Sequence, residues 1–418
     1  MELRPGYKQT EVGAIPEDWE THPLGVGVRL LSGQHVLARH CNTDGDGTPY
    51  ITGPADFPEG VIQHTRFTTE PGTLCRSNDI LVTVKGSGAG TVVLSNADYC
   101  ISRQLMAIRV TEWNTGYIYF SLLRDASLFG AAATGLIPGL SRNDILNKVI
   151  PLPPTKAEQQ AIAGALRDAD ALIESLEHLI AKKRHLKQGA VQELLSGKKR
   201  LPGFDRHGRQ NSELGEMPVD WRVVEIGAIA AVKTGPFGSS LHERDYVGDG
   251  TPIITVEHLA ERGVLHTNLP MVSDTDRKRL SAYSLEEGDI VFSRVGSVDR
   301  NARISKQEHG WLFSGRLLRL RRLDDSTDTN YLSYHFHSEP FKQRVRTVAV
   351  GQTMASLNTR ILQKVMVLLP GPPEQAAIAA VLFDMGAEIA ALEAKLAKAR
   401  QVKQGMMHNL LTGRIRLV

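Results

Sequence analysis

The stretch Glu158-Gln-Gln-Ala-Ile-Ala163 occurs a second time in this chain of 418 residues, as Glu374-Gln-Ala-Ala-Ile-Ala379. The likeness extends far beyond these residues, because 135–201 aligns with 351–417 without a gap. About 29 of those 67 pairs are identical, which is the mark of an internal repeat. The sequence therefore predicts that one structural unit has been built twice.

A second pair of matching segments opens each half of the chain. Gln9-Thr-Glu-Val-Gly-Ala-Ile-Pro-Glu-Asp-Trp19 is similar to Asn211-Ser-Glu-Leu-Gly-Glu-Met-Pro-Val-Asp-Trp221. Identity fades between the matching segments of each half. Two constant frames that enclose two divergent inserts predict one scaffold that carries two different recognition modules.

The composition is that of an ordinary globular protein, with 41% hydrophobic and 23% charged residues. At 418 residues we expect two domains or more, each with its own core. No run approaches the roughly eighteen apolar residues of a membrane span, and Met1-Glu-Leu-Arg-Pro-Gly6 lacks a hydrophobic signal segment. We therefore expect a soluble, cytoplasmic protein without membrane contact. Cys41, Cys75 and Cys100 form no C-x-x-C pair and are expected to be buried free thiols.

The net charge of +3 says little about partners, but basic residues are concentrated in the second half. Residues 277–322 contain eleven Lys and Arg against five acids, whereas the equivalent stretch 66–110 contains five against three. Solvated surface charge explains the second ratio. The first is dense enough to indicate a polyanionic partner.

Each half is predicted to be a mixed α/β module followed by one long helix. Strand-like runs include Asp79–Val84 and Asp289–Ser293, each followed by a Gly-Ser turn. A proline-rich segment, Pro151-Leu-Pro-Pro154 or Pro370-Gly-Pro-Pro373, separates module from helix, because proline cannot continue a ladder. The predicted domains are a first module at 1–155, a helix at 156–200, a linker at 201–219, a second module at 220–372 and a helix at 373–418.

Apolar residues recur in steps of four and three along both helices, which are expected to span about 158–196 and 374–412. This a/d seam is typical of coiled-coil pairing. An amphipathic core helix would show a similar stripe, but two equal seams of this length favour the helices pairing with each other. The seam residues are Ile162, Leu166, Ala169, Ile173, Leu176 and Ile180 in the first helix, and Ile378, Leu382, Met385, Ile389, Leu392 and Leu396 in the second.

The connections predict that the two helices run antiparallel. The first helix ends near Gly197, and only a short linker separates it from Trp221 of the second module, which returns the chain to the start of the second helix. Arg416-Leu417 matches Arg200-Leu201, so the last residues are expected near the first module. We therefore expect an α/β (α+β) fold in which two globular modules are joined by two long antiparallel coiled-coil helices with pseudo-two-fold symmetry.

No motif in the sequence indicates catalysis. Gly86-Ser-Gly-Ala-Gly90 has the spacing of neither a dinucleotide fingerprint nor a P-loop, and its counterpart at Gly296 loses two of the glycines. His242 and the pair His335 and His337 lack metal-ligand spacing. The sequence has no G-x-S-x-G and no N-P-P-[YF] motif of an adenine methyltransferase. We therefore expect a binding protein without a cofactor, metal or catalytic residue of its own.

Taken together, these motifs resemble those of the DNA specificity (S) subunit of a type I restriction–modification enzyme. The resemblance rests on the opening segment Lys8–Trp19, on the Pro-Leu-Pro-Pro-like stretches followed by Glu-Gln-x-x-Ile, and on the helix endings Leu194-Leu-Ser-Gly197 and Leu410-Leu-Thr-Gly413. It covers nearly the whole chain.

The resemblance implies two target-recognition domains, each of which reads one half of a split, asymmetric site on double-stranded DNA. It also implies that the two helices act as a ruler and as the docking surface for two methyltransferase (M) subunits, with restriction (R) subunits outside them. S-adenosylmethionine would be bound by the M subunits and not by this chain.

Two loops in each module have the residue types that contact DNA. Arg, Lys, Asn, Gln, Ser and Thr on protruding loops read base edges, while Lys, Arg and backbone N–H groups bind phosphates. For each residue the alternative of a structural turn remains open, with Ser141 and Asn358 capping a short helix. Arg103 and Arg316 are further candidates for phosphate contacts. The loop residues predicted to contact DNA are Lys85, Gly86, Ser87, Gly88, Ser141, Arg142 and Asn143 in the first module, and Arg294, Gly296, Ser297, Arg300, Arg303, Gln352, Asn358, Thr359 and Arg360 in the second.

A double-headed scaffold that recognises protein and has no DNA activity is the other interpretation of the duplicated frame. The basic density of 277–322 argues against it. Binding to random duplex DNA would separate the two interpretations, because DNA binding falls steeply as salt rises.

Overall fold

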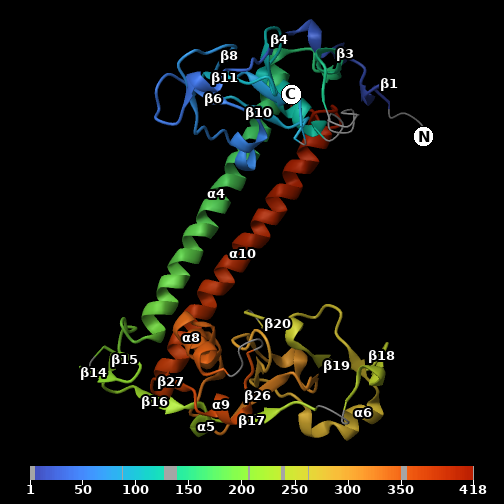
Figure 1. Cartoon of the computed structure of the whole chain (residues 1–418). Coiled ribbons are helices and arrows are strands. Elements are labelled where there is room, and N and C mark those ends of the chain that lie inside the picture. The colour runs from blue at the N-terminus through green and yellow to red at the C-terminus, as the bar shows by residue number, and fades with distance from the viewer. Residues whose placement is uncertain are drawn as a thin grey trace. The chain divides into compact units, whose positions relative to one another are not determined.

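The computed structural model describes residues 5–86, 88–126, 139–205, 208–236, 241–261, 263–349 and 355–417. The chain divides into two compact units, of which the first comprises Met1–His178 and Glu393–Val418 and the second Leu179–Leu392. Each unit contains one α/β module and part of each of two long helices. These helices, α4 (Lys156–Leu195) and α10 (Pro372–Leu410), are continuous in Figure 1.

The module of the first unit is built on two separate sheets, and one strand of the four-stranded sheet is buried on both faces. Every residue of β9 (Ile80–Thr83) is buried. Ile80 and Val82 belong to one core cluster and Leu81 to another, which explains why apolar residues occupy consecutive positions. The four-stranded sheet is antiparallel, in the order β10 (Val92–Leu94), β9, β12 (Leu105–Val110) and β4 (Val28–Ser32). The second sheet has the order β5 (Cys41–Asn42), β7 (Phe67–Thr68), β6 (Thr48–Ile51), β11 (Tyr99–Ile101) and β8 (Leu74–Cys75), with β6 and β11 parallel.

The module of the second unit repeats this arrangement. Its buried strand is β23 (Ile290–Ser293), in which Ile290 and Phe292 belong to one core cluster and Val291 to another. The first sheet has the order β17 (Ala230–Thr234), β26 (Leu317–Arg322), β23 and β24 (Asn301–Arg303). The second has the order β18 (Tyr246–Val247), β22 (Met271–Val272), β19 (Thr251–Ile254) and β25 (Leu312–Phe313), with β19 and β25 parallel.

Short strands outside the main sheets form the constant frame of each module. The first frame pairs β1 (Tyr7–Thr10) with β2 (Gly13–Pro16), and β3 (Glu20–Pro23) with β13 (Val149–Leu152). The second pairs β14 (Arg209–Ser212) with β15 (Gly215–Pro218), and β16 (Arg222–Glu225) with β27 (Met366–Leu369). The hairpin β20 (Leu259–Ala260) and β21 (Gly263–Val264) occurs in the second module.

Helices other than α4 and α10 are short. Asn114 caps the first of them by accepting from the N–H of Tyr117, and Asp328 caps its counterpart in the second module in the same way. The short helices are α1 (Thr115–Arg124), α3 (Arg142–Leu146), α5 (Ile226–Ile229), α6 (Asp274–Arg279), α7 (Thr329–His337), α8 (Glu339–Val348) and α9 (Thr359–Gln363).

The apolar seam of the long helices is largely buried, and two ion pairs give the helix direction in the first unit. In the first unit Asp170 pairs with Lys403 and Glu177 with Arg400, so α4 and α10 run antiparallel there. The buried seam residues are Ile162, Leu166, Leu176, Ile180, Ile378, Leu382 and Ile389, while Ile173, Leu392 and Leu396 are half-buried.

One part of α10 is more apolar than the sequence analysis allowed. An 18-residue window of this helix has a mean hydropathy of 1.5, and 28% of it is buried. By length and composition alone the helix could cross a membrane, although core helices of soluble proteins pass the same test. Ile378 and Leu382 lie in the core of the second unit together with Leu194 and Leu195 of α4, which gives this part of α10 an apolar environment within the protein.

Candidate nucleic-acid interface

Two exposed polar residues of the first module lie on the turn between β11 and β12. The N–H of Leu105 donates to the carbonyl of Ser102 at 2.9 Å and closes the turn. The Ser102 hydroxyl is buried and donates to the carbonyl of Thr52 at 2.6 Å, and it accepts from the N–H of Gln104 at 3.1 Å. The two central residues, Arg103 and Gln104, are exposed. The fold therefore holds the backbone of this turn and leaves two polar side chains to solvent.

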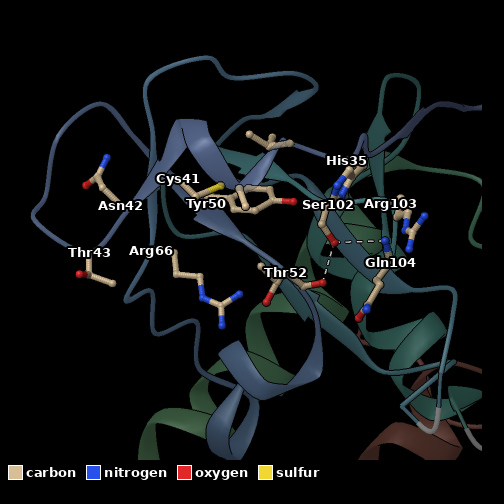
Figure 2. Close-up of a pocket in the computed structure, with 12 residues that line it drawn as sticks. His35, Cys41, Asn42, Thr43, Tyr50, Thr52, Arg66, Ser102, Arg103 and Gln104 are labelled. Atoms are coloured by element: carbon tan, nitrogen blue, oxygen red, sulfur yellow. Dashed lines mark hydrogen bonds between the residues drawn. The ribbon is translucent and has the colours of Figure 1, made fainter.

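A cavity of about 540 Å³ lies beside this turn. Figure 2 shows Arg103 and Gln104 on one side of it, and Asn42 at the end of β5 with Thr43 directly after it. Burial raises the pKa of the Tyr50 hydroxyl, so this group stays protonated at neutral pH. The cavity is lined by His35, Val36, Ala38, Cys41, Asn42, Thr43, Tyr50, Thr52, Arg66, Ser102, Arg103 and Gln104.

The charge of this lining has one sign. Arg66 and Arg103 contribute guanidinium groups, both residues are exposed, and no Asp or Glu lines the cavity. Within the described residues neither arginine has an ion pair or a side-chain hydrogen bond. Guanidinium, amide and hydroxyl groups around an apolar floor suit the acceptor-rich edges of bases and the oxygens of phosphates.

The second module has the same turn between β25 and β26. The N–H of Leu317 donates to the carbonyl of Ser314 at 3.0 Å, and Arg316 occupies the exposed third position. The carbonyl of Arg316 accepts from the N–H of Arg294 at 2.8 Å, just as the carbonyl of Gln104 accepts from Val84 at 2.8 Å. The structure therefore equates Gln104 with Arg316.

A glycine packs against the start of each turn. A Cβ on Gly33 would lie 2.1 Å from the carbonyl oxygen of Ser102, and a Cβ on Gly235 would lie 2.1 Å from that of Ser314. A side chain at either position would displace the turn. Equivalent glycines in the two modules therefore allow the same close approach of the backbone.

The two predicted loops of each module lie side by side. Lys85 forms a β-bridge with Gly139, and the N–H of Leu140 donates to the carbonyl of Val84 at 2.9 Å. In the second module Val295 forms the bridge with Ser356. Val295 is therefore the counterpart of Lys85, in agreement with the matching Gly-Ser turns that follow the two residues.

The glycines of the first loop have structural roles. Gly86 has a φ of +90° and Gly296 a φ of +75°, so each adopts the left-handed conformation that favours glycine. A Cβ on Gly88 would come within 2.3 Å of the ring of Pro54. Lys85 and Ser297 are exposed, and Ser87 lies outside the described residues.

The second predicted loop is largely structural in the first module. Ser141 caps α3 by accepting from the N–H of Asp144 at 3.2 Å. The guanidinium of Arg142 donates to the Ser32 hydroxyl at 2.7 Å and to the carbonyl of Leu30 at 3.1 Å, which ties α3 to β4. Asn143 is exposed.

Its counterpart in the second module begins with another cap. Asn358 accepts from the N–H of Ile361 at 2.8 Å at the start of α9. Thr359 is half-buried and Arg360 is exposed. Gln352 lies outside the described residues. Both of the residues for which a capping role was left open, Ser141 and Asn358, are therefore caps.

Much of the positive charge in 277–322 is used inside the second module. Arg321 donates to Asp289 at 2.7 Å, and this hydrogen bond raises the pKa of the guanidinium. Arg319 is 8% exposed, and burial lowers its pKa. Arg300 donates to the carbonyl of Leu259 at 2.5 Å. Arg303 donates to the Thr329 hydroxyl at 3.0 Å, and Arg294 donates to the carbonyl of Gly315 at 3.4 Å. The dense basic stretch is therefore weaker support for a polyanion than the sequence indicated.

Sequence reasoning missed most of the cavity. His35, Asn42, Thr43, Arg66 and Gln104 come from four separate stretches of the chain, and no spacing in the sequence links them. Gln104 is adjacent to the predicted Arg103, but it was not among the residues predicted to contact DNA. Within the ranges that the structure describes, no group of three or more His, Cys, Asp or Glu side chains could hold a metal ion.

Comparisons with known proteins agree with this architecture. The chain is 22% identical to the type I restriction enzyme MjaVIII specificity subunit of Methanocaldococcus jannaschii, over 98% of this chain and 96% of that protein. It is 24% identical to the putative type I restriction enzyme MjaX specificity subunit of the same organism, over 98% and 97%.

Solved structures show the same fold. The crystal structure of a type I restriction–modification S subunit from M. genitalium superposes with a TM-score of 0.60, at 16% identity, over 98% of both chains. A structure from work on complex assembly and conformational transition of a type I system gives a TM-score of 0.54, at 18% identity, over 96% of this chain and 99% of the other.

The family model for the type I restriction modification DNA specificity domain matches twice, at residues 16–182 and 218–401. The two matches coincide with the two halves of the internal repeat and take in both modules and most of both long helices. On this evidence the chain belongs to the family of type I restriction–modification DNA specificity proteins.

Proposed function

We propose that this chain is the DNA specificity subunit of a type I restriction–modification complex and that each module reads one half of a bipartite, asymmetric site. The observation that carries the proposal is the family match to both halves of the chain. The chain is the non-catalytic component of such a system, and S-adenosylmethionine would be bound by its methyltransferase partners.

The two modules share their frames and differ in what they expose, as two readers of different half-sites should. Each module holds an equivalent turn with the same backbone hydrogen bonds, whereas the residue at the exposed third position is Gln104 in one and Arg316 in the other. The proposed domains follow this division: modules at 1–155 and 220–372, helices at 156–200 and 373–418, and a linker at 201–219.

The long helices are proposed to pair as an antiparallel coiled coil that sets the spacer between the half-sites. Helices of 40 and 39 residues are each about 60 Å long. Two half-sites on one face of B-DNA lie about 34–36 Å apart, so the helices are long enough to separate two readers. Coiled-coil packing registers by heptads, which would make the spacing stiff.

Exposed apolar side chains on the helices support docking of partner subunits. Leu179 and Leu186 of α4 are 39% and 52% exposed, and Phe383 of α10 is 65% exposed. Large apolar side chains on a solvent-facing helix surface mark an interaction site when they gather there. We propose that two methyltransferase subunits bind to these helices, with restriction subunits outside them, and that the complex is cytoplasmic.

Exchange of one module tests the proposal. Residues 220–372 would be replaced by the corresponding module of another S subunit, and the complex with M subunits would be profiled by methylation-aware sequencing. We expect one half of the methylated sequence to change and the other half and the spacer to stay. A change in both halves, or in neither, would contradict the two-reader model.

The salt dependence of binding distinguishes a DNA specificity subunit from a scaffold that recognises protein. DNA binding by the complex should weaken steeply between low and moderate salt, because counterions are released from the phosphates. Weak binding that does not depend on salt would favour the scaffold.

A further inference from the structure

We propose that Gln104 and Arg316 are equivalent base-reading residues, Gln104 recognising an adenine in the half-site of the first module and Arg316 a guanine in that of the second. This inference rests on the proposed function. It assigns a base preference to one position in each module, which neither the family match nor the fold does.

The backbone places both side chains at the same point of the fold. Each residue is third in a turn that leaves a buried strand of one sheet and enters a central strand of the other. In each turn the N–H of the fourth residue donates to the carbonyl of the first, at 2.9 Å in the first module and 3.0 Å in the second. The carbonyls of Gln104 and Arg316 accept at 2.8 Å from the N–H groups of Val84 and Arg294, respectively. The N–H groups of Gly33 and Gly235 donate to the carbonyls of the fourth turn residues, Leu105 and Leu317, at 3.0 Å and 3.1 Å. A position held by strands on both sides is precise enough for base recognition.

The side chains themselves have no structural task. Gln104 and Arg316 are exposed, and within the described residues neither side chain has a hydrogen bond or ion pair. The amide of Gln104 lies over the backbone of Gly53, where a Cβ would come within 2.5 Å of its Oε1 atom. The amide is therefore placed at the mouth of the cavity while its donors and acceptor remain available.

The chemistry of the two side chains selects different bases. A glutamine amide can donate to N7 and accept from N6 of adenine in the major groove, and an arginine guanidinium can donate to both O6 and N7 of guanine. The neighbouring position differs as well. Arg103 adds a positive charge in the first module, whereas Gly315 adds no side chain in the second. Arg316 is thus the only charged side chain among the four residues of its turn, whereas Gln104 is adjacent to Arg103, a candidate for a phosphate contact.

Reciprocal exchange of the two residues is the test, in the complex with M subunits. Gln104→Arg should convert one A·T pair of one half-site to G·C, and Arg316→Gln should convert one G·C pair of the other half-site to A·T. A bidentate contact discriminates by about 5- to 150-fold, so methylation rates on matched duplexes should shift by that factor. Arg29→Ala, which removes an exposed charge from β4, is the matched control and should leave both half-sites unchanged.

Alanine variants keep the test decisive if an exchanged side chain does not fit. Gln104→Ala and Arg316→Ala should each relax one position and leave the others intact. If the wild-type complex methylates no bipartite sequence, the proposed function itself is contradicted. A wild-type bipartite site that all four variants leave unchanged, or that the alanine variants weaken equally on every sequence, would overturn the base assignment alone.

Discussion

Arg200 and Glu374 lie 174 residues apart in the chain and form a bidentate ion pair, with Nε–Oε1 and Nη2–Oε2 distances of 2.9 and 2.6 Å. Arg200 follows the end of α4, and Glu374 lies in the first turn of α10. Their side chains are 7% and 3% exposed. The indole of Trp221 donates to the same carboxylate at 2.9 Å, and Asp220 accepts from Arg200 at 2.7 Å. This cluster connects both helices to the frame of the second module.

Removing the arginine should destabilise the second unit strongly. Arg200→Ala leaves the buried Glu374 carboxylate without its cation, and breaking a buried pair in this way costs about 3–5 kcal/mol. Urea unfolding of the whole chain, followed by tryptophan fluorescence, should show a lower midpoint for this variant. The exposed neighbour variant Lys199→Ala is the control and should unfold at the wild-type midpoint. Equal midpoints for the two variants would show that the ion pair does not stabilise the frame.

The first unit repeats this cluster with two differences. Arg416 pairs with Glu158, whose side chain is 1% exposed, and with Asp18. Among the described residues the indole N–H of Trp19 has no hydrogen-bond partner, whereas its counterpart Trp221 donates to Glu374. The Arg416 side chain is also 31% exposed. Arg416→Ala should therefore lower the urea midpoint of its unit by less than Arg200→Ala lowers that of the other.

A buried histidine should make the second unit sensitive to mild acid. His335 is 2% exposed, and burial, assisted by the charge of Arg344, lowers its pKa to about 3. In the unfolded chain its pKa is about 6.5, so between these values the unfolded state binds a proton that the folded state does not. Stability contributed by this group is therefore full above pH 6.5 and falls as the pH drops toward 3.

This loss should amount to about 1 kcal/mol at pH 5.5, one unit below the unfolded pKa. His335→Phe, which keeps a planar ring beside Tyr331 and Phe341, should reduce the difference between the urea midpoints at pH 7.5 and 5.5. His309→Gln, at an exposed position, should retain the wild-type difference. An unchanged pH dependence in the His335 variant would assign the acid sensitivity to other groups.

Arg103 should contribute to DNA affinity without contributing to sequence preference. It lies on the cavity rim, is exposed and has no ion pair within the described residues, as expected for a phosphate contact. Arg103→Ala should weaken binding of the complex to all sequences alike and reduce the slope of log affinity against log salt by about one. Arg29→Ala carries the same charge change on β4 of the same module. If both variants reduce the slope equally, the effect of Arg103 is one of net charge and not of contact.

The elements that sequence analysis predicted well are those set by local pattern. The spacing of apolar residues by four and three positions from Ile162 to Ile180 predicted a buried stripe along one helix. Helical periodicity can be recognised without knowledge of distant contacts. The match of Arg416 to Arg200 predicted that the last residues lie near the first module, and Arg416 pairs there with Glu158 and Asp18. The residues predicted to contact DNA remain predictions, since the structure gives their positions and not their ligands.

The parts that could not be predicted depend on long-range pairing. Arg319 and Arg321 looked like surface charge in the sequence, but β26 carries one into the core and places the other against Asp289. The hydrogen bonds from Val84 and Arg294 that hold the turns at Gln104 and Arg316 likewise join segments that are distant in the chain. Residue spacing alone contains neither piece of information.

Exposed apolar side chains on the long helices should be needed for assembly and not for folding. Phe383 is 65% exposed and Leu186 52% exposed, so replacing either by serine removes little buried surface from the chain itself. If the helices bind M subunits through these positions, Phe383→Ser and Leu186→Ser should each weaken the complex by about 1.5–3 kcal/mol, the effect of losing one buried large apolar side chain.

The complex can be measured by titrating M subunits onto labelled chain and following sedimentation. Leu265→Ser, at a position in the second module that is 47% exposed, is the matched control because it removes a similar apolar group away from both helices. The urea midpoint of all three variants should equal that of the wild type. If both helix variants bind M subunits with wild-type affinity, the docking surface lies elsewhere. If the Leu265 variant loses as much affinity as the helix variants, assembly depends on surface apolarity in general and not on the helix face.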